Sequence, residues 1–182
     1  MRRLLLLIGS VLGIFLLASG AGAASDKENM IYLELKDGRV VIETLPDLAP
    51  NHVARITELV RQGFYDGIVF HRVIEGFMAQ TGDPTGTGTG GSGKKLDAEF
   101  STEPHVRGIV SMARSQDPNS ADSQFFIVFD DATFLDKQYT VWGRVIEGME
   151  HVDNIKRGHP RTGAVDGPDK IISMKMAADV DK

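Results

Sequence analysis

The chain has 182 residues, of which 42% are hydrophobic and 25% charged, so it is long enough for one domain with a sizeable core. It contains no cysteine, which excludes disulfide bonds, a thiol nucleophile and a thiolate metal site. A formal net charge of −5 at pH 7, with no run of basic residues, argues against a nucleic-acid partner.

The N-terminus has the three parts of a secretory signal. Residues 1–3 are Met-Arg-Arg, residues 4–17 are apolar, and residues 21–23 (Ala-Gly-Ala) form a small-x-small cleavage pattern. We therefore expect residues 1–24 to be a signal peptide and residues 25–182 to be the mature domain, with no stable membrane insertion after cleavage. The alternative is an uncleaved anchor, because the uncharged stretch is just long enough to span a bilayer.

Two strands and a helix are predicted next. Residues 30–35 and 40–45 read as strands joined by an Asp-Gly turn, which is a strong hairpin signal. A helix is expected to begin near Pro50, because the first turn tolerates proline, and to end at Gly63. Its apolar stripe, which should cover an open end of the sheet, consists of Val53, Ile56, Leu59 and Val60.

Residues 70–83 predict a hairpin that carries an unexpected charge. Period-two alternation places Arg72 on the same face of the first strand as Phe70 and Ile74. Burying a lone guanidinium is costly, so Arg72 is expected to donate hydrogen bonds at a site. The second strand and its entrance would add an apolar pocket with a polar edge, formed by Phe77, Met78 and Gln80.

Residues 82–93 are rich in Gly, Thr and Ser and are expected to form a loop. Residues 88–95 come close to the phosphate-binding pattern G-x-x-x-x-G-K-[ST], which would indicate a nucleotide site. However, Lys95 stands where that pattern needs a hydroxyl residue, and no buried strand leads into the loop. The sequence therefore favours a flexible surface loop, and no cofactor is expected.

Further strands are expected at residues 108–113, 123–129, 139–146 and 171–176. Residues 123–129 are apolar on both faces, which favours a strand inside a closed sheet. A helical turn at residues 130–136 and a short helix before Gly158 complete the elements. Seven or eight strands with two helices predict a mainly β fold, a closed antiparallel barrel in which closure removes the strand edges.

The other polar residues do not assemble into a metal site or a hydrolase. None of the five histidines shows the H-x-x-x-H or H-E-x-x-H spacing of a zinc site, so no metal is expected. Ser111 and Ser123 have no evident histidine partner and no nucleophile-elbow context. His71 adjoins Arg72 but should point to the opposite face, so we expect a structural role for it.

Residues 70–83 (F-H-R-V-I-E-G-F-M-A-Q-T-G-D) and 123–127 (S-Q-F-F-I) resemble the signature of the cyclophilins, the cyclosporin-binding peptidyl-prolyl cis-trans isomerases. The resemblance extends from about Met30 to Met176. It implies a closed eight-stranded antiparallel barrel capped by two α-helices. Together with the N-terminal signal, it implies a bacterial, exported, periplasmic isomerase that assists the folding of exported proteins, or one anchored to the inner membrane if the signal is retained.

The resemblance also carries site residues onto this chain. It makes Arg72 the catalytic residue, and the substrate-binding residues are Phe77, Met78, Gln80, Ala113, Arg114, Gln124, Phe126, Phe134, Leu135 and Tyr139. Three of these depart from the best-known eukaryotic pattern, which has Asn for Arg114, often Trp for Phe134, and His for Tyr139. We expect the departures to change cyclosporin affinity and flanking-residue preference while keeping the prolyl pocket.

Isomerisation of an X-Pro bond needs no acid–base group. The prolyl nitrogen regains a lone pair in the twisted amide, and a donor from Arg72 would stabilise that state more than the planar one. The expected partners are proline-containing unfolded or exposed polypeptide segments, bound by a monomer. Two alternatives stay open: a catalytically weak peptide-binding module that uses the same pocket, and a scaffold subunit built on the same fold.

Overall fold

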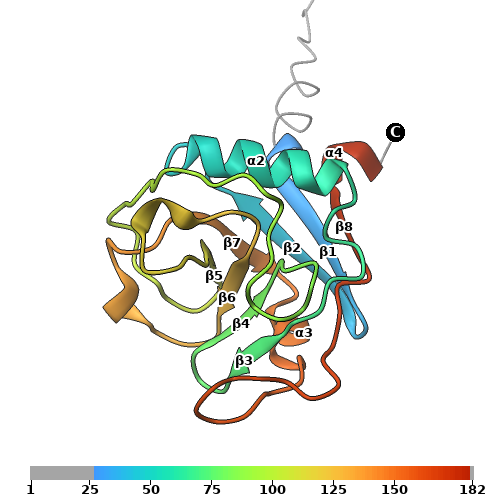
Figure 1. Ribbon diagram of the computed structural model, residues 1–182. Coiled ribbons are helices and arrows are strands. Elements are labelled where there is room, and N and C mark those ends of the chain that lie inside the picture. Colours follow the sequence, from blue (N-terminus) through green and yellow to red (C-terminus); the bar gives the residue numbers. More distant parts are fainter. Residues whose placement is uncertain (1–26, 181–182) are drawn as a thin grey trace, which may run out of the picture.

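The computed structural model describes residues 27–180 (Figure 1), so the predicted signal peptide lies outside the described residues. The strands are β1 (Met30–Leu35), β2 (Gly38–Thr44), β3 (Arg72–Ile74), β4 (Met78–Thr81), β5 (Ile109–Met112), β6 (Phe125–Val128), β7 (Val141–Glu147) and β8 (Ser173–Met176). The helices are α2 (Pro50–Arg61), α3 (Met149–Asp153) and α4 (Ala177–Val180), with 3₁₀ turns at Pro118–Ser120 and Thr133–Leu135. Within this part of the chain, no helix is both long and apolar enough to span a bilayer.

All eight strands form one antiparallel sheet in the order β3-β4-β6-β5-β7-β2-β1-β8. The prediction of a closed barrel is wrong, because β3 and β8 are the two edges and do not pair; the sheet is an open, curled half-barrel. The irregular segment 163–171 lies along the edge instead. The N–H of Val73 donates to Gly163, and the N–H of Phe70 donates to Asp169. These bonds occupy the backbone groups that barrel closure would have used.

The first hairpin and the long helix form as the sequence predicts. Leu35 pairs with Gly38 across the turn, and alternate residues of β1 are buried. The predicted stripe of α2 is also buried. Figure 1 shows α2 lying across one end of the curled sheet, where it contacts β7 and β8, while α3 contacts β2.

Apolar side chains on both faces of the sheet create two hydrophobic clusters. On β6, Phe125 and Ile127 belong to the main core, whereas Phe126 and Val128 belong to a smaller cluster on the opposite face. Met78 of β4 joins this second cluster. The strand is therefore apolar on both faces although the sheet stays open, because one face packs in the main core and the other in the second cluster.

Phe70 departs from the predicted alternation. The sequence analysis placed it on the face of Arg72, but Phe70 is fully buried in the main core together with Val73. Strand β3 begins only at Arg72, so the period of two does not extend back to residue 70. The prediction for Arg72 itself is unaffected, and its pairing with Gln80 places both side chains at the second cluster.

Candidate active site

A cavity of about 290 Å³ opens onto the second cluster. Ten of the eleven predicted site residues line it: Arg72, Phe77, Met78, Gln80, Ala113, Arg114, Phe126, Phe134, Leu135 and Tyr139. The eleventh, Gln124, lines an adjoining cavity of about 390 Å³ that shares Gln80, Ala113 and Arg114 with the first. The fold thus gathers side chains from β3, β4 and β6 and from the segments that follow β5 and β6 into one place.

The floor and one wall of the first cavity are apolar. Met78, Phe126 and Leu135 are buried, and the rings of Phe77 and Phe134 lie against each other with centroids 5.4 Å apart. Phe134 is 65% exposed and forms the open rim. Such a lining can bury a small apolar ring and hold it by contact alone.

Arg72 supplies the polar edge. Its Nε donates to the Thr162 carbonyl at 3.2 Å, and its Nη1 donates to Gln80 Oε1 at 3.2 Å. Among the described residues Nη2 has no hydrogen-bond partner, and Arg72 lines the cavity. Partial burial lowers the pKa of Arg72, but a guanidinium stays charged in proteins at ordinary pH.

Two glutamines continue the polar edge away from Arg72. Gln80 Nε2 donates to Gln124 Oε1 at 2.9 Å. Gln124 Nε2 in turn donates to the carbonyls of Gly88 at 3.1 Å and Gly90 at 2.8 Å. The glycine-rich loop, which we expected to be a flexible surface loop, therefore contacts the site through its backbone.

Arg114 holds the rim together. Its Nε and Nη2 donate to the Gln138 carbonyl at 3.0 and 2.9 Å, and its Nη1 donates to the Ser115 carbonyl at 2.8 Å. The guanidinium carbon lies 4.6 Å from the centroid of the Tyr139 ring. Arg114 thus lines both cavities while most of its donors are engaged by the chain itself.

A buried histidine network, which the sequence did not reveal, lies beside Phe126 of the cavity lining. His105 Nε2 lies 3.0 Å from Ser111 Oγ, and His105 Nδ1 lies 3.0 Å from Asp136 Oδ1. The expectation that Ser111 lacks a histidine partner was therefore wrong. Ser111 and His105 are both fully buried, and Ser111 Oγ donates to the Thr140 carbonyl, so the serine cannot reach a substrate. Burial lowers the pKa of His105 although neighbouring Asp136 acts in the opposite direction.

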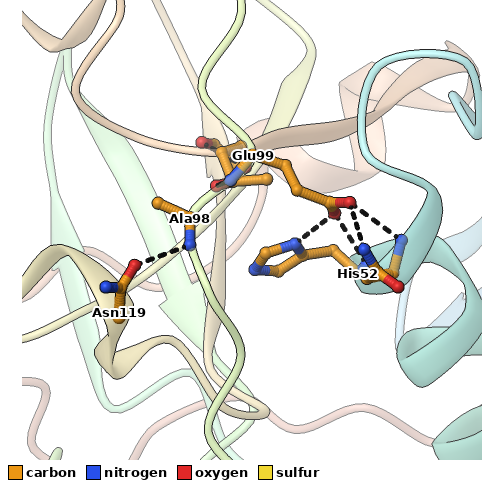
Figure 2. A network of polar contacts seen from close by, with 7 residues as sticks. His52, Ala98, Glu99 and Asn119 are labelled. Atoms are coloured by element: carbon orange, nitrogen blue, oxygen red, sulfur yellow. Dashed lines mark hydrogen bonds and ion pairs between the residues drawn. The ribbon is translucent and has the colours of Figure 1, made fainter.

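A second histidine–carboxylate pair caps α2, as Figure 2 shows. Glu99 accepts hydrogen bonds from the backbone N–H groups of Asn51 at 3.1 Å and His52 at 3.0 Å, and it lies 2.6 Å from His52 Nδ1. Ala49 provides no side-chain cap, so Glu99 satisfies the free donors of the first turn. The adjacent Ala98 N–H donates to Asn119 Oδ1 at 2.9 Å.

No group of three or more potential metal ligands occurs within residues 27–180. His71 has both ring nitrogens buried without a hydrogen-bond partner in this part of the chain. Burial lowers the pKa of His71, with Asp83 acting in the opposite direction. A neutral, unpartnered imidazole is consistent with the structural role that we expected for His71.

Comparison with known proteins identifies the family. The family model of cyclophilin type peptidyl-prolyl cis-trans isomerases matches residues 30–176. The chain belongs to the cyclophilin family. A probable peptidyl-prolyl cis-trans isomerase of Brucella abortus is 57% identical over 170 residues, which cover 86% of this chain and 87% of that protein. The rat peptidyl-prolyl cis-trans isomerase-like 3 is 46% identical over 125 residues, covering 66% and 77%. The chain is accordingly a cyclophilin-type isomerase.

Solved cyclophilins have the same fold. The chain superposes on the cyclophilin AquaCyp293 of Hirschia baltica with a TM-score of 0.77, at 33% identity, covering 85% of this chain and 76% of that one. It superposes on a cyclophilin-type isomerase of Cryptosporidium parvum, crystallised in the presence of the dipeptide Ala-Pro, with a TM-score of 0.74, at 29% identity, covering 81% and 98%.

Proposed function

We propose that this cyclophilin isomerises X-Pro bonds in unfolded or exposed segments of exported proteins, by non-covalent stabilisation of the twisted amide. The observation that carries the proposal is Arg72, a permanent cation with an unengaged Nη2 donor at the edge of an apolar cavity. The cavity would take the prolyl ring, and Arg72 would reach its nitrogen. The Ala-Pro dipeptide present with the Cryptosporidium parvum relative supports a proline-containing substrate.

The chemistry follows from the electronic structure of the amide. A planar X-Pro bond has partial double-bond character, and its rotation has a barrier of about 20 kcal/mol. At the twisted state the conjugation is lost and the prolyl nitrogen becomes pyramidal with an available lone pair. A hydrogen bond from Arg72 to that nitrogen is strong only in the twisted state, so it lowers the barrier without tightening ground-state binding.

The assay that tests this function follows cis–trans relaxation of a short X-Pro peptide with the mature chain. We expect catalysis at micromolar protein, together with faster refolding of a protein whose refolding is limited by proline isomerisation. A cyclophilin fold that only binds peptides would perturb the peptide signals without accelerating exchange. That result would favour the binding-module alternative and contradict the proposal.

We also propose that the protein acts in the periplasm as a monomer, after removal of residues 1–24. Support comes from the charged start, apolar run and Ala-Gly-Ala pattern of the N-terminus. Mass spectrometry of the protein from its native host should find a new N-terminus near residue 25 in the soluble periplasmic fraction. An intact Met1 in the membrane fraction would contradict cleavage and favour the inner-membrane anchor.

A further inference from the structure

Asp83 is a buried carboxylate whose partners are nearly all in the glycine-rich loop. It is 1% exposed, and its Oδ1 accepts from the Thr85 N–H at 2.7 Å and the Thr85 hydroxyl at 2.8 Å. Its Oδ2 accepts from the N–H groups of Gly88 at 2.6 Å and Gly90 at 3.1 Å. Burial alone would raise the pKa of Asp83, but these hydrogen bonds lower it to about 2.

The loop wraps so closely around Asp83 that one position has room only for glycine. A Cβ atom on Gly90 would lie 2.1 Å from Asp83 Oδ1, although the backbone of Gly90 is otherwise open to any residue. The backbone groups of Gly88 and Gly90 therefore make contacts with two different side chains. Their N–H groups donate to Asp83, and their carbonyls accept from the side-chain amide of Gln124.

The two carbonyls determine the orientation of the Gln124 amide. Both accept from Nε2, so Oε1 must lie on the opposite side, where it accepts from Gln80 Nε2 at 2.9 Å. That leaves Gln80 Oε1 to accept from Arg72 Nη1 at 3.2 Å. If either amide were reversed, an NH₂ group would face another donor, and the contact with the guanidinium would be lost.

We propose that Asp83 is a positioning residue for Arg72, acting through the backbone of residues 85–90 and the Gln124–Gln80 pair. The inference rests on the proposed role of Arg72 in the reaction and adds a carboxylate that does not touch the cavity. Asp83 sets where the loop carbonyls lie, the carbonyls set the amide polarity of both glutamines, and the second glutamine directs Nη1. Nη2 lies in the same guanidinium plane, so the contact that holds Nη1 also sets the position of Nη2.

The first test is Asp83→Asn, which replaces one acceptor oxygen by an NH₂ group that conflicts with the loop donors. We expect kcat to fall by about tenfold to a hundredfold with KM nearly unchanged, because misplacement of a catalytic group by about 1 Å costs up to about a hundredfold in rate. Asp66→Asn is the matched control. Asp66 accepts a backbone N–H from Met174 at 2.9 Å in β8, at the sheet edge opposite β3, so its loss should leave kcat unchanged.

A double-mutant cycle separates positioning from general loss of structure. In a Gln124→Ala background the connection is already cut, so Asp83→Asn should cause no further fall in kcat. In a Phe134→Ala background, which alters only the apolar rim, Asp83→Asn should cause its full fall. Equal falls in the wild-type and Gln124→Ala backgrounds would overturn the proposal.

A measurement without substrate keeps this inference separate from the proposed function. The ¹⁵N–¹H signal of Arg72 Nε should shift in Asp83→Asn and stay in place in Asp66→Asn. If Asp83→Asn does not fold, Gly90→Ala displaces the same carboxylate from the loop side and should give the same shift. An unchanged Arg72 signal in the folded variant would overturn the positioning role. Full activity of Arg72→Ala would instead overturn the proposed function and leave this readout intact.

Discussion

The apolar wall and the polar edge of the cavity differ in whether they can distinguish a planar from a twisted X-Pro amide. In the proposed mechanism, the apolar wall of Phe77, Phe126 and Leu135 would contact a prolyl ring equally in the planar and the twisted state, so it would contribute to binding alone. The polar edge of Arg72, which is held by Gln80, offers a donor that becomes useful when the prolyl nitrogen regains its lone pair. The proposed mechanism therefore assigns affinity to the apolar wall and rate to the polar edge of one cavity of about 290 Å³.

Truncating the wall should give the largest stability effect and separate the two sides most clearly. Phe126→Ala removes a side chain that is 4% exposed, so we expect a loss of about 3–5 kcal/mol in the free energy of unfolding. We expect KM to rise about tenfold to a hundredfold, since burying such a ring contributes roughly 1.5–3 kcal/mol, with kcat nearly unchanged. Denaturant unfolding and steady-state kinetics measure both effects.

The control for this variant is the adjacent residue on the other face of β6. Phe125 is fully buried against Tyr65 and Trp142 in the main core, so Phe125→Ala should destabilise the protein similarly. It should leave KM near the wild-type value. If both variants raised KM equally, the wall would have no special role in binding.

Lowering the pH should reduce the stability of the folded protein, because it protonates Asp83. Its pKa is about 2 in the folded protein against an ordinary 3.8, so the ionised form favours the folded state. That contribution is fully present above about pH 4 and is lost as the pH falls towards 2. It is worth roughly 2 kcal/mol at about 1.36 kcal/mol per pKa unit. Asp83→Asn should therefore lose less stability than the wild type between pH 5 and pH 2. Thermal unfolding of both proteins across this range measures the difference. An identical decrease of stability with pH in the two proteins would contradict the prediction.

Cyclosporin binding tests the role of Phe134 at the rim of the cavity. Phe134 keeps most of the apolar face that a Trp would present there but has no indole N–H donor. One hydrogen bond contributes roughly 0.5–1.5 kcal/mol, so Phe134→Trp should tighten cyclosporin binding by up to about tenfold. Turnover should barely change, because it depends on Arg72 and the ring pocket. Equal inhibition of the two proteins in a titration would show that residue 134 does not control cyclosporin binding.

The smallest expected effect is that of pH on turnover. Arg72 stays charged, and burial lowers the pKa of both His71 and His105. The value of kcat/KM should be nearly constant from about pH 7 to pH 9. A bell-shaped profile in this range would indicate an acid–base group on the polar side and contradict a proton-free mechanism.

Local signals predict part of this site, whereas the resemblance to the cyclophilins supplied the others: Ala113, Arg114, Phe134, Leu135 and Tyr139. The charge of Arg72 within an apolar strand, and the two apolar faces of residues 123–129, are visible in alternation alone. The open sheet was not predictable in this way, since it depends on how the irregular segment 163–171 lies along residues 67–73.

Contacts that join distant or irregular segments were also missed. His105 meets Ser111 across a turn and Asp136 across 31 residues, and neither spacing belongs to a known pattern. Asp83 accepts from the Thr85 N–H two residues on, a local turn contact of the kind that the sequence alone can suggest. Its contacts with the loop glycines are made by the backbone N–H groups of Gly88 and Gly90, which the residue types do not predict.

The most direct test of the account is steady-state kinetics of Arg72→Ala beside Arg72→Lys and the wild type. Loss of a transition-state donor typically costs about 2.7–4 kcal/mol, so kcat of Arg72→Ala should fall by roughly a hundredfold to a thousandfold. KM should stay within about threefold, because the apolar wall is intact. Arg72→Lys keeps the charge without the planar fork and should recover only part of kcat. A folded Arg72→Ala protein with near-wild-type kcat would contradict the separation of rate from binding across the cavity.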